Sequence, residues 1–336
     1  MTTKMRAVQV VGYHQDLELT EVPVPEPTGP FDVIVKIGGA GVCRTDLHIL
    51  EGQWAEKSGV ALPYTIGHEN AGWVHAVGDA VTNVAVGDPV ILHPLVTCGL
   101  CRACRSGDDV HCENSRFPGI DSDGGMAEYL LTSARSVVKL ADGLEPAAVA
   151  ALADAGLTAY HAVRKAVPLL YPGTTCVVIG AGGLGHIGVQ CLLAMTATRV
   201  VVVDPNPAAR ELARSLGAHE VTDRTDDLVD SAHVVLDFVG EQGAEKVGLA
   251  MTRRAGSYFV IGYGGTVDIP TIDLISTERN IIGNLVGSYN DLDELMTLAA
   301  QGRVTLHTRT YPLTAVNEAI DDLEAGRLQG RGILVP

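Results

Sequence analysis

The stretch TCVVIGAGGLGHIG, residues 175–188, decides the fold of the second half of the chain. A short apolar segment rich in valine runs into a glycine-rich turn, and a helix-forming segment follows. Such a turn lets the backbone approach a pyrophosphate, which binds the positive N–H groups at the helix N-terminus. The pattern predicts a dinucleotide site whose cofactor-binding residues are Gly180, Gly182, Gly183, Leu184 and Gly185.

Glycine turns of this kind also occur without a ligand, so the residue that ends the next apolar segment matters. Asp204 ends RVVVVD, residues 199–204, and lies nineteen residues beyond Gly185. A carboxylate there accepts hydrogen bonds from the adenosine ribose and repels a 2′-phosphate, which favours NAD over NADP. The alternative is that Asp204 is only a solvated turn residue.

The second half alternates between apolar strands and helices. We expect strands at 175–180, 199–204, 233–240 and 256–262, and helices at 183–195 and 207–217. Strands that are apolar throughout and alternate with helices form a parallel sheet covered on both faces. Two amphipathic helices (291–302 and 314–326), a last strand (332–336) and an apolar edge strand (280–288) complete this half.

The first half, residues 1 to about 150, shows a different pattern of secondary structure. Short segments of strand type are separated by glycine and proline, as in RAVQVV, LELTEV, DVIVKI, AGWVHAVG, DPVILH and MAEYLLT. Their spacing predicts a barrel-like unit of β-strands. The total of 336 residues is more than one hydrophobic core usually serves, so two domains are expected.

The amino-acid composition argues against some classes of binding partner. Forty acidic and 24 basic residues give a formal charge of −16, a field that repels nucleic acid and anionic lipid. No stretch of about 20 apolar residues appears, and the opening MTTKMRAVQVV lacks the pattern of a signal peptide. We therefore expect a cytoplasmic protein that binds neither membrane nor nucleic acid.

Four of the seven cysteines lie in CGLCRACRSGDDVHC, residues 98–112. A disulfide network is disfavoured, because cytosolic thiols stay reduced and seven is an odd number. Thiolates at this spacing fit zinc, and iron–sulfur remains the alternative. The candidate ligands are Cys98, Cys101, Cys104 and Cys112.

Two further segments offer metal ligands. GVCRTDLH places Thr45, Asp46 and His48 beside Cys43, and TIGHENAG places Glu69 beside His68. Either segment alone is unremarkable, because a buried cysteine is usually a small apolar residue and a lone histidine is usually structural. Only the combination suggests a second metal site.

Together these segments resemble one family along essentially the whole chain, the zinc-dependent, medium-chain alcohol dehydrogenases. The matching motifs are AGVCRTDLH (40–48), PYTIGHENAGWV (63–74), the four-cysteine segment, DAGLTAYHAV (154–163), GAGGLGHIG (180–188) and GRGILVP (330–336). The resemblance points to bacterial and archaeal members that act on secondary and aromatic alcohols.

The resemblance implies an α/β fold with a GroES-like β-barrel catalytic domain (1–153 and 291–336) and a Rossmann doubly wound parallel sheet for NAD (154–290). It implies two zinc ions per subunit. The four cysteines would hold a closed structural zinc, whereas Cys43, His68 and Asp154 would hold a catalytic zinc with one open position. Glu69 would be an alternate ligand or act behind the ligands, and Asp46 would orient His68. The alternative for Asp154 is that it only caps the helix that follows.

The family's reaction is a reversible hydride transfer between an alcohol and NAD that gives an aldehyde or ketone. By resemblance, Thr45 and His48 would relay the alcohol proton through the nicotinamide ribose. Arg44 and Arg331 would reach the pyrophosphate, and Thr158 would back the nicotinamide ring. Trp54 and Leu95 would line an apolar substrate pocket. Relatives form dimers or tetramers, and we expect a homotetramer.

Three alternatives remain open. A zinc-ribbon interaction module would explain the four cysteines, but not Cys43, His68 or the dinucleotide motif. A zinc-free quinone reductase would share the fold but lack the ligands. Within the family, a polyol or amino-alcohol dehydrogenase is the second candidate.

Overall fold

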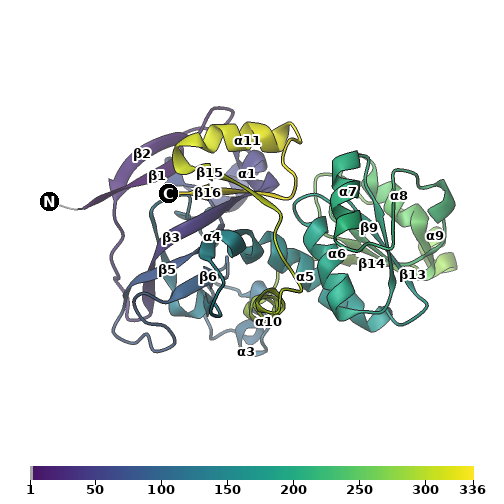
Figure 1. Ribbon diagram of the computed structural model, residues 1–336, viewed down its shortest axis with the longest axis horizontal. Helices are drawn as coiled ribbons and strands as arrows, with labels where there is room; N and C mark the ends of the chain where they lie inside the picture. The colour runs from purple at the N-terminus through teal and green to yellow at the C-terminus, as the bar shows by residue number, and fades with distance from the viewer. Residues whose placement is uncertain (1–2) are drawn as a thin grey trace. The chain divides into compact units, whose positions relative to one another are not determined.

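The computed structural model describes residues 3–336 and divides into two compact units, each considered by itself. Unit 1 contains the chain up to Ala155, together with Ser288–Ala300 and Leu306–Pro336. Unit 2 contains Gly156–Gly287 and Gln301–Thr305. Figure 1 shows the elements of both units along the chain. No helix in the described part is long and apolar enough to cross a membrane.

Unit 1 is built mainly of antiparallel strands around the long strand β3. Its strands are β1 (Lys4–Val10), β2 (Glu18–Pro23), β3 (Asp32–Val42), β4 (Tyr64–Thr65), β5 (Glu69–Val77), β6 (Pro89–Leu92), β7 (Tyr129–Ser133), β8 (Val137–Lys139), β15 (Thr308–Pro312) and β16 (Arg331–Val335). Seven of them form one sheet in the order β15-β16-β3-β5-β6-β8, with β7 also paired to β3. The strands β2, β1 and β4 form a separate small sheet.

Short helices connect the strands of unit 1. The α-helices are α1 (Arg44–Leu50), α2 (Ala55–Ser58), α3 (Arg102–Arg105), α4 (Pro146–Val149), α10 (Tyr289–Ala300) and α11 (Val316–Glu324). The 3-10 helices are η1 (Asp109–His111), η2 (Ala134–Ser136), η3 (Ala150–Ala153) and η6 (Leu313–Ala315).

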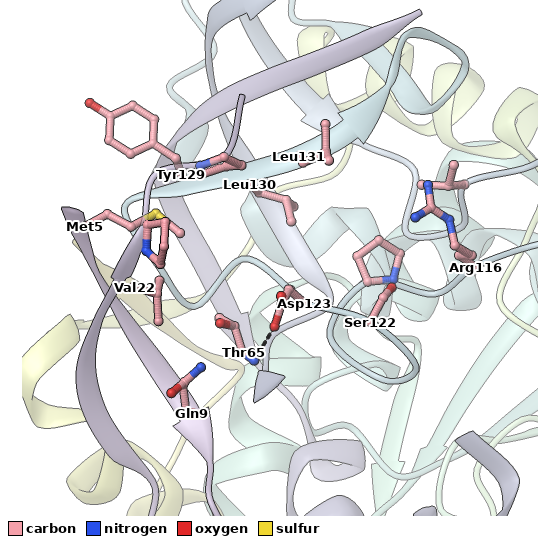
Figure 2. A pocket seen from close by; sticks show the side chains of 15 residues that line it. Met5, Gln9, Val22, Thr65, Arg116, Ser122, Asp123, Tyr129, Leu130 and Leu131 are labelled. Atoms are coloured by element: carbon pink, nitrogen blue, oxygen red, sulfur yellow. Dashed lines mark hydrogen bonds between the residues drawn. The ribbon is translucent and has the colours of Figure 1, made fainter. Parts of the chain in front are cut away.

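A cavity of about 400 Å³ opens beside the small sheet (Figure 2). Met5 and Gln9 of β1 and Leu130 of β7 are among its lining residues. Two lining residues are hydrogen-bonded, because the backbone N–H of Thr65 donates to Oδ1 of Asp123 at 2.8 Å.

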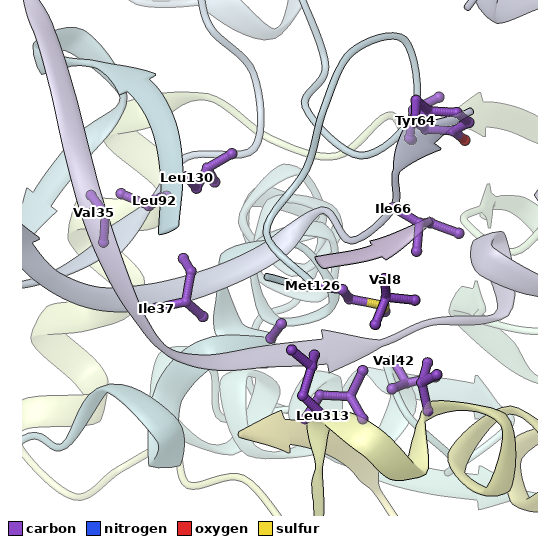
Figure 3. Close-up of a cluster of buried hydrophobic side chains, with 14 of the residues drawn as sticks. Val8, Val35, Ile37, Val42, Tyr64, Ile66, Leu92, Met126, Leu130 and Leu313 are labelled. Carbon is purple, nitrogen blue, oxygen red and sulfur yellow. The ribbon is translucent and has the colours of Figure 1, made fainter. Parts of the chain in front are cut away.

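The core of unit 1 is a cluster of aliphatic side chains on alternate positions of the strands (Figure 3). Val35, Ile37 and Val42 of β3 belong to it, and Leu92 of β6 and Leu313 of η6 join from other parts of the chain. Since this core fixes both ends of β3, it also fixes the residue that follows Val42.

Unit 2 is a six-stranded parallel sheet in the order β11-β10-β9-β12-β13-β14. The strands are β9 (Thr175–Ile179), β10 (Arg199–Val203), β11 (Glu220–Thr222), β12 (Ala232–Asp237), β13 (Thr252–Val260) and β14 (Asn280–Gly283). The helices are α5 (Ala155–Ala166), which begins at the last residue of unit 1, η4 (Val167–Leu169), α6 (Gly185–Met195), α7 (Pro207–Ser215), η5 (Asp226–Leu228), α8 (Ala244–Met251) and α9 (Thr271–Thr277). The central strand β9 is buried because neighbours cover it on both sides, as its continuous apolar sequence predicts.

The predicted fold class, a GroES-like barrel and a doubly wound parallel sheet, is confirmed. The predicted helix at 183–195 begins at Gly185, because the preceding glycines form the turn itself. The predicted edge strand is confirmed as β14, but it ends at Gly283 rather than at residue 288. The role of each unit, cofactor binding or catalysis, stays a prediction at this point.

Candidate active site

Four candidate metal ligands converge inside unit 1. Cys43, His68, Glu69 and Asp154 are all buried, and one donor atom from each lies within 4.8 Å of the others. Cys43 follows β3, His68 immediately precedes β5, Glu69 is its first residue, and Asp154 follows η3. Three separate segments therefore bring one thiol, one imidazole and two carboxylates to a single buried point.

Cys43 is held by the turn between strand and helix. It has an extended backbone, with φ −119° and ψ 155°, and stands immediately before α1. Its N–H donates to Oδ2 of Asp46 at 2.8 Å, and Asp46 is fully buried. A carboxylate that accepts this otherwise unpaired N–H fixes the start of the helix. The thiol is thereby fixed as well.

His68 lies between two carboxylates. Its Nδ1 is 3.5 Å from Oδ1 of Asp46, and its Nε2 is 3.6 Å from Oδ2 of Asp154. Burial alone lowers the pKa of His68, but the carboxylate of Asp46 and the thiol of Cys43 outweigh it and raise that pKa well above its usual range. A cation beside Nε2 would compete with this proton, so metal binding here is coupled to proton release.

Asp154 stands immediately before α5, and its carboxylate is buried. Its Oδ1 is buried and accepts no hydrogen bond within residues 3–336, and the N–H of Ala155 donates to Glu69 instead, at 3.1 Å. Burial, chiefly, raises the pKa of Asp154 to about 6. A buried polar atom without a partner costs about 1–3 kcal/mol, which a bound cation would offset. The ligand role of Asp154 stays a prediction, with capping of α5 as the alternative.

Glu69 is paired with the buried guanidinium of Arg331 from β16. Nη2 of Arg331 donates to Oε1 of Glu69, while Oε2 of Glu69 has no hydrogen-bond partner among the described residues. Burial alone would lower the pKa of Arg331, but Glu69 and Cys43 raise it, so the guanidinium stays charged. The predicted contact of Arg331 with a pyrophosphate stays a prediction, because this side chain is 3% exposed and engaged with Glu69.

The donor set fits zinc. Cysteine, histidine and a carboxylate are all common zinc ligands, and three protein ligands leave a fourth position for a substrate. Oδ1 of Asp154, Oε2 of Glu69 and Nε2 of His68 have no hydrogen-bond partner among the described residues, and such an ion could satisfy them. A hard cation such as Mg²⁺ would be a poor match for the thiol.

Helix α1 presents the predicted proton-relay residues next to this set. Thr45 and His48 are three residues apart in α1, so they lie on one face of the helix. His48 is buried and Thr45 half-buried, whereas Arg44 is exposed at the start of the helix. The predicted contact of Arg44 with a pyrophosphate and the relay role of Thr45 and His48 stay predictions.

The four-cysteine segment forms a second cluster in unit 1. The sulfur atoms of Cys98, Cys101, Cys104 and Cys112 lie within 4.8 Å of one another, and those of Cys98 and Cys104 are 3.9 Å apart. Sulfurs around a tetrahedral zinc are about 3.8 Å apart, since each Zn–S bond is about 2.3 Å. All four cysteines are free rather than paired in disulfides.

Backbone N–H groups stabilise the thiolate form of Cys98, the form that binds a metal. The N–H groups of Leu100 and Cys101 each donate to Sγ of Cys98 at 3.4 Å. These two bonds lower the pKa of Cys98 to about 6, whereas burial raises the pKa of Cys104 to about 12. A thiol that already ionises near neutral pH favours thiolate ligation. Four thiolates would fill the tetrahedral coordination of a zinc ion and leave no position for a substrate, which suits a structural role.

Unit 2 carries the glycine turn. Gly180 has φ +84°, and its N–H donates to the carbonyl of Val203 at 2.9 Å. A Cβ on Gly185 would lie 1.8 Å from the carbonyl oxygen of Gly180, so only glycine permits this approach. A Cβ on Gly182 would meet nothing within 4 Å, so the turn faces open space. Leu184 stands immediately before α6.

Asp204 stands beside this turn and is held by the backbone. Its Oδ2 accepts the N–H of Ala181 at 2.8 Å, and its Oδ1 accepts the N–H of Asn206 at 2.7 Å. The side chain is buried rather than solvated, which counts against the turn-residue alternative. Each oxygen keeps acceptor capacity for a second donor, as recognition of ribose hydroxyls requires.

Comparisons with known proteins agree with this geometry. Residues 29–142 match the Alcohol dehydrogenase GroES-like domain, and residues 183–301 match the Zinc-binding dehydrogenase family. The chain belongs to the zinc-type, medium-chain alcohol dehydrogenase family.

Individual members of the alcohol dehydrogenase family match nearly the whole chain. An alcohol dehydrogenase structure from the archaeon Aeropyrum pernix is 44% identical, with a TM-score of 0.95, and the match covers 98% of this chain and 100% of that one. A NAD-dependent alcohol dehydrogenase of Sulfurisphaera tokodaii is 36% identical over 99% of this chain and 100% of its own length. A D-arabinose 1-dehydrogenase (NADP(+)) of Saccharolobus solfataricus is 34% identical over 99% of this chain and 98% of its own.

The structure assigns no role to three further predicted residues of this alcohol dehydrogenase family member. Trp54 is half-buried against the core of unit 1, and Leu95 is buried. Thr158 is buried on α5 in unit 2. No contact reported for the described residues brings Trp54 and Leu95 together, so their substrate-pocket role stays a prediction.

Sequence reasoning missed one aromatic side chain beside the metal ligands. The ring of Phe117 meets the ring of His68 edge to face, with centroids 5.9 Å apart. Asp121 holds the loop, because its Oδ1 accepts the N–H of Phe117 at 2.8 Å. The chain has only four phenylalanines, and one of them directly after the four-cysteine segment was the available signal.

Proposed function

We propose that the protein is a zinc-dependent alcohol dehydrogenase. It transfers a hydride reversibly between NAD and a primary or secondary alcohol, apolar or aromatic, and gives an aldehyde or ketone. The observation that carries this proposal is the convergence of Cys43, His68 and Asp154 at one buried point, with donor atoms left unsatisfied. Three ligands of this type leave a coordination position for an alcohol oxygen.

Bound there, zinc would supply a Lewis acid that lowers the pKa of an alcohol. Other residues of the chain would hold the zinc ligands in position. Asp46 holds the imidazole of His68 from behind and fixes the N–H of Cys43, so one buried carboxylate orients two ligands. Arg331 neutralises Glu69 and occupies its Oε1.

Thr45 and His48 would move the alcohol proton. Their spacing of three residues on α1 puts a hydroxyl and an imidazole on one face of the helix. A hydroxyl both accepts and donates a proton, and a histidine changes charge near neutral pH. Release of a proton to solvent by this route suits an oxidation that begins by deprotonating the substrate.

NAD would supply the hydride acceptor, and Asp204 supports it over NADP. Three of the similar proteins bear names that specify NAD, whereas the D-arabinose dehydrogenase is named for NADP. The same relative supports the second candidate, a polyol dehydrogenase. The apolar character predicted for Trp54 and Leu95, with the ring of Phe117 beside His68, favours a less polar substrate.

A substrate panel tests this function. The purified holoprotein would be assayed by NADH or NADPH absorbance with secondary, aromatic and short primary alcohols, with D-arabinose and with the matching ketones. We expect turnover of an apolar alcohol with NAD. Turnover of the sugar alone would favour the polyol candidate, and no redox turnover with any pair would contradict the proposal.

We also propose a homotetramer. Strand β14 lies at the edge of the parallel sheet, and Leu285 just beyond it is 55% exposed. Ile272 and Ile275 of α9 are likewise exposed. An edge strand with exposed apolar side chains beside it is suited to pair with its copy across a two-fold axis.

A further inference from the structure

Asp109 joins the four-cysteine segment (98–112) to the start of α10. It belongs to η1 inside that segment and is 4% exposed. Its Oδ1 accepts the backbone N–H of Tyr289 at 2.9 Å, and Oγ1 of Thr97 donates to its Oδ2 over a longer 3.4 Å. Figure 1 shows α10 next to α3 of the same segment. One buried carboxylate thus connects the cysteine segment to a helix 180 positions further along the chain.

The hydrogen bond from Tyr289 is made at the end of α10 that needs an acceptor. Tyr289 is the first residue of α10, and the first N–H groups of a helix have no partner inside it. They also carry a partial positive charge, which favours a carboxylate. Oδ2 of Asp291 accepts the N–H of Ser288 at 2.8 Å. Two carboxylates, one local and one from the cysteine segment, therefore fix the start of α10.

Helix α10 in turn packs against the segment that ends at Asp154. One set of apolar side chains of α10 is buried, namely Leu292, Leu295, Met296 and Ala299. The helix packs against η3, whose residues are all buried, and η3 also packs against β3 and β5. Asp154 follows η3 directly, and its Oδ2 lies 3.6 Å from Nε2 of His68. The position of η3 therefore decides how close this carboxylate lies to the imidazole.

We propose that Asp109 is a positioning residue for the metal site of Cys43, His68 and Asp154: it holds the start of α10, and through α10 and η3 it fixes the position of Asp154. The four-cysteine segment acts in this way on the other metal site as well as on its own fold. All these elements belong to unit 1, and packed elements that touch one another transmit displacements. This inference rests on the two zinc sites of the proposed function.

Cobalt(II) is the probe for the test. It binds the same types of ligand as zinc, and its visible absorption depends on those ligands and their geometry. Cobalt would be exchanged into the intact protein, and its affinity would be measured by competition with a chelator. Cys43→Ala supplies the spectrum of the four-cysteine site alone, so the signal of the Cys43 site is obtained by difference.

Asp109→Leu keeps the approximate size of the side chain and removes both acceptor oxygens. We expect it to weaken cobalt binding at the Cys43 site about tenfold, within the range that groups behind the ligands contribute. The absorption bands of that site should shift, because Asp154 is displaced. Asp109→Asn should restore most of the affinity, because its amide oxygen accepts the N–H of Tyr289 and its amide N–H can donate to the hydroxyl of Thr97.

A second pair of variants tests the same hydrogen bond from the other side. Proline is tolerated at the first position of a helix but has no N–H, so Tyr289→Pro removes the donor to Asp109. Tyr289→Ala removes the phenol ring and keeps that donor, so it is the matched reference. We expect weaker cobalt binding at the Cys43 site in the proline variant than in the alanine variant. This pair decides the question even if Asp109→Leu does not fold.

Two controls separate positioning from a general loss of stability. Asp108→Asn alters the exposed neighbour of Asp109 and should leave cobalt binding unchanged. Asp322→Asn removes a buried carboxylate of α11 and should lower the unfolding temperature without weakening cobalt binding at the Cys43 site. Equal weakening by Asp109→Leu and Asp322→Asn would overturn the proposal.

Failure of this inference can be told apart from failure of the proposed function. If the wild type binds no metal at the Cys43 site, the proposed function itself has failed. If the wild type binds metal at both sites, and the proline and alanine variants of Tyr289 bind cobalt equally well, only the positioning role of Asp109 is refuted.

Discussion

Nε2 of His68 lies 3.6 Å from Oδ2 of Asp154, although one residue opens a strand of the barrel and the other follows a 3-10 helix. A tetrahedral zinc with bonds of about 2.1 Å would hold nitrogen and oxygen ligands about 3.4 Å apart. The two side chains are therefore almost at ligand spacing, and the role of Asp154 can be tested directly.

Asp154→Asn should lower both zinc content and kcat. The amide keeps the shape of the side chain but removes the charge that offsets the metal, and loss of a ligand is severe for metal retention. Asp154→Cys should restore much of the zinc, because thiolate is a strong zinc ligand but makes a poor cap. Metal analysis and kcat would be measured for all three proteins. Full zinc and full activity in the Asn variant would show that Asp154 is not a ligand.

Asp46→Asn should weaken zinc binding about tenfold to a hundredfold without removing any ligand. The amide oxygen can still accept the N–H of Cys43, so the start of α1 is preserved and only the charge beside His68 is lost. Zinc affinity would be measured by competition with a chelator. An unchanged affinity would mean that Asp46 serves only to cap the helix.

Cys101→Ser should remove one zinc ion of two and lower the unfolding temperature. The segment 98–112 has few buried apolar residues, so the metal supplies most of its order. Cys191→Ala, in the core of α6, is the control and should retain both ions. Metal analysis of the wild type finding a single zinc, or iron, would contradict the assignment of this cluster.

Asp322→Asn should destabilise unit 1 at neutral pH and have little effect in acid. Asp322 accepts from Tyr311 at 2.7 Å and from Arg327 at 2.6 Å, and these bonds lower its pKa. A lowered pKa in the folded state means that the stabilisation is complete above the unfolded value and is lost as pH falls through the folded value. The exposed neighbour Asp321→Asn is the control, and thermal unfolding from pH 7 down to about 3 is the measurement. If Asp322→Asn lowers the unfolding temperature by the same amount at every pH in this range, protonation of Asp322 is not linked to stability.

Ile281→Lys on β14 should shift the assembly to smaller species. A charge on the edge strand opposes pairing with a second copy. Tyr171→Lys replaces another exposed apolar side chain of unit 2 and should leave the assembly unchanged. Light scattering would give the mass of each protein, and a monomeric wild type would disprove the tetramer.

The sequence predicted the parts of the site that are local in the chain. The spacing of the four cysteines, the glycine turn and the nearness of Asp46 to Cys43 are set within a few residues, so they can be read directly. The pairing of Glu69 with Arg331 could not be read, because it depends on β16 lying beside β3 in the folded sheet. The contact of Phe117 with His68 likewise depends on how the loop after the cysteines returns to the barrel.

The pairing of Glu69 with Arg331 also constrains the order of biosynthesis. Glu69 is fully buried, and its countercharge is supplied by a residue that the ribosome adds 262 positions later. A buried carboxylate without its partner is strongly unfavourable, so the nascent barrel cannot close over Glu69 when β5 emerges. Closure of the site around the charged Glu69 therefore follows the synthesis of β16 and its pairing with β3.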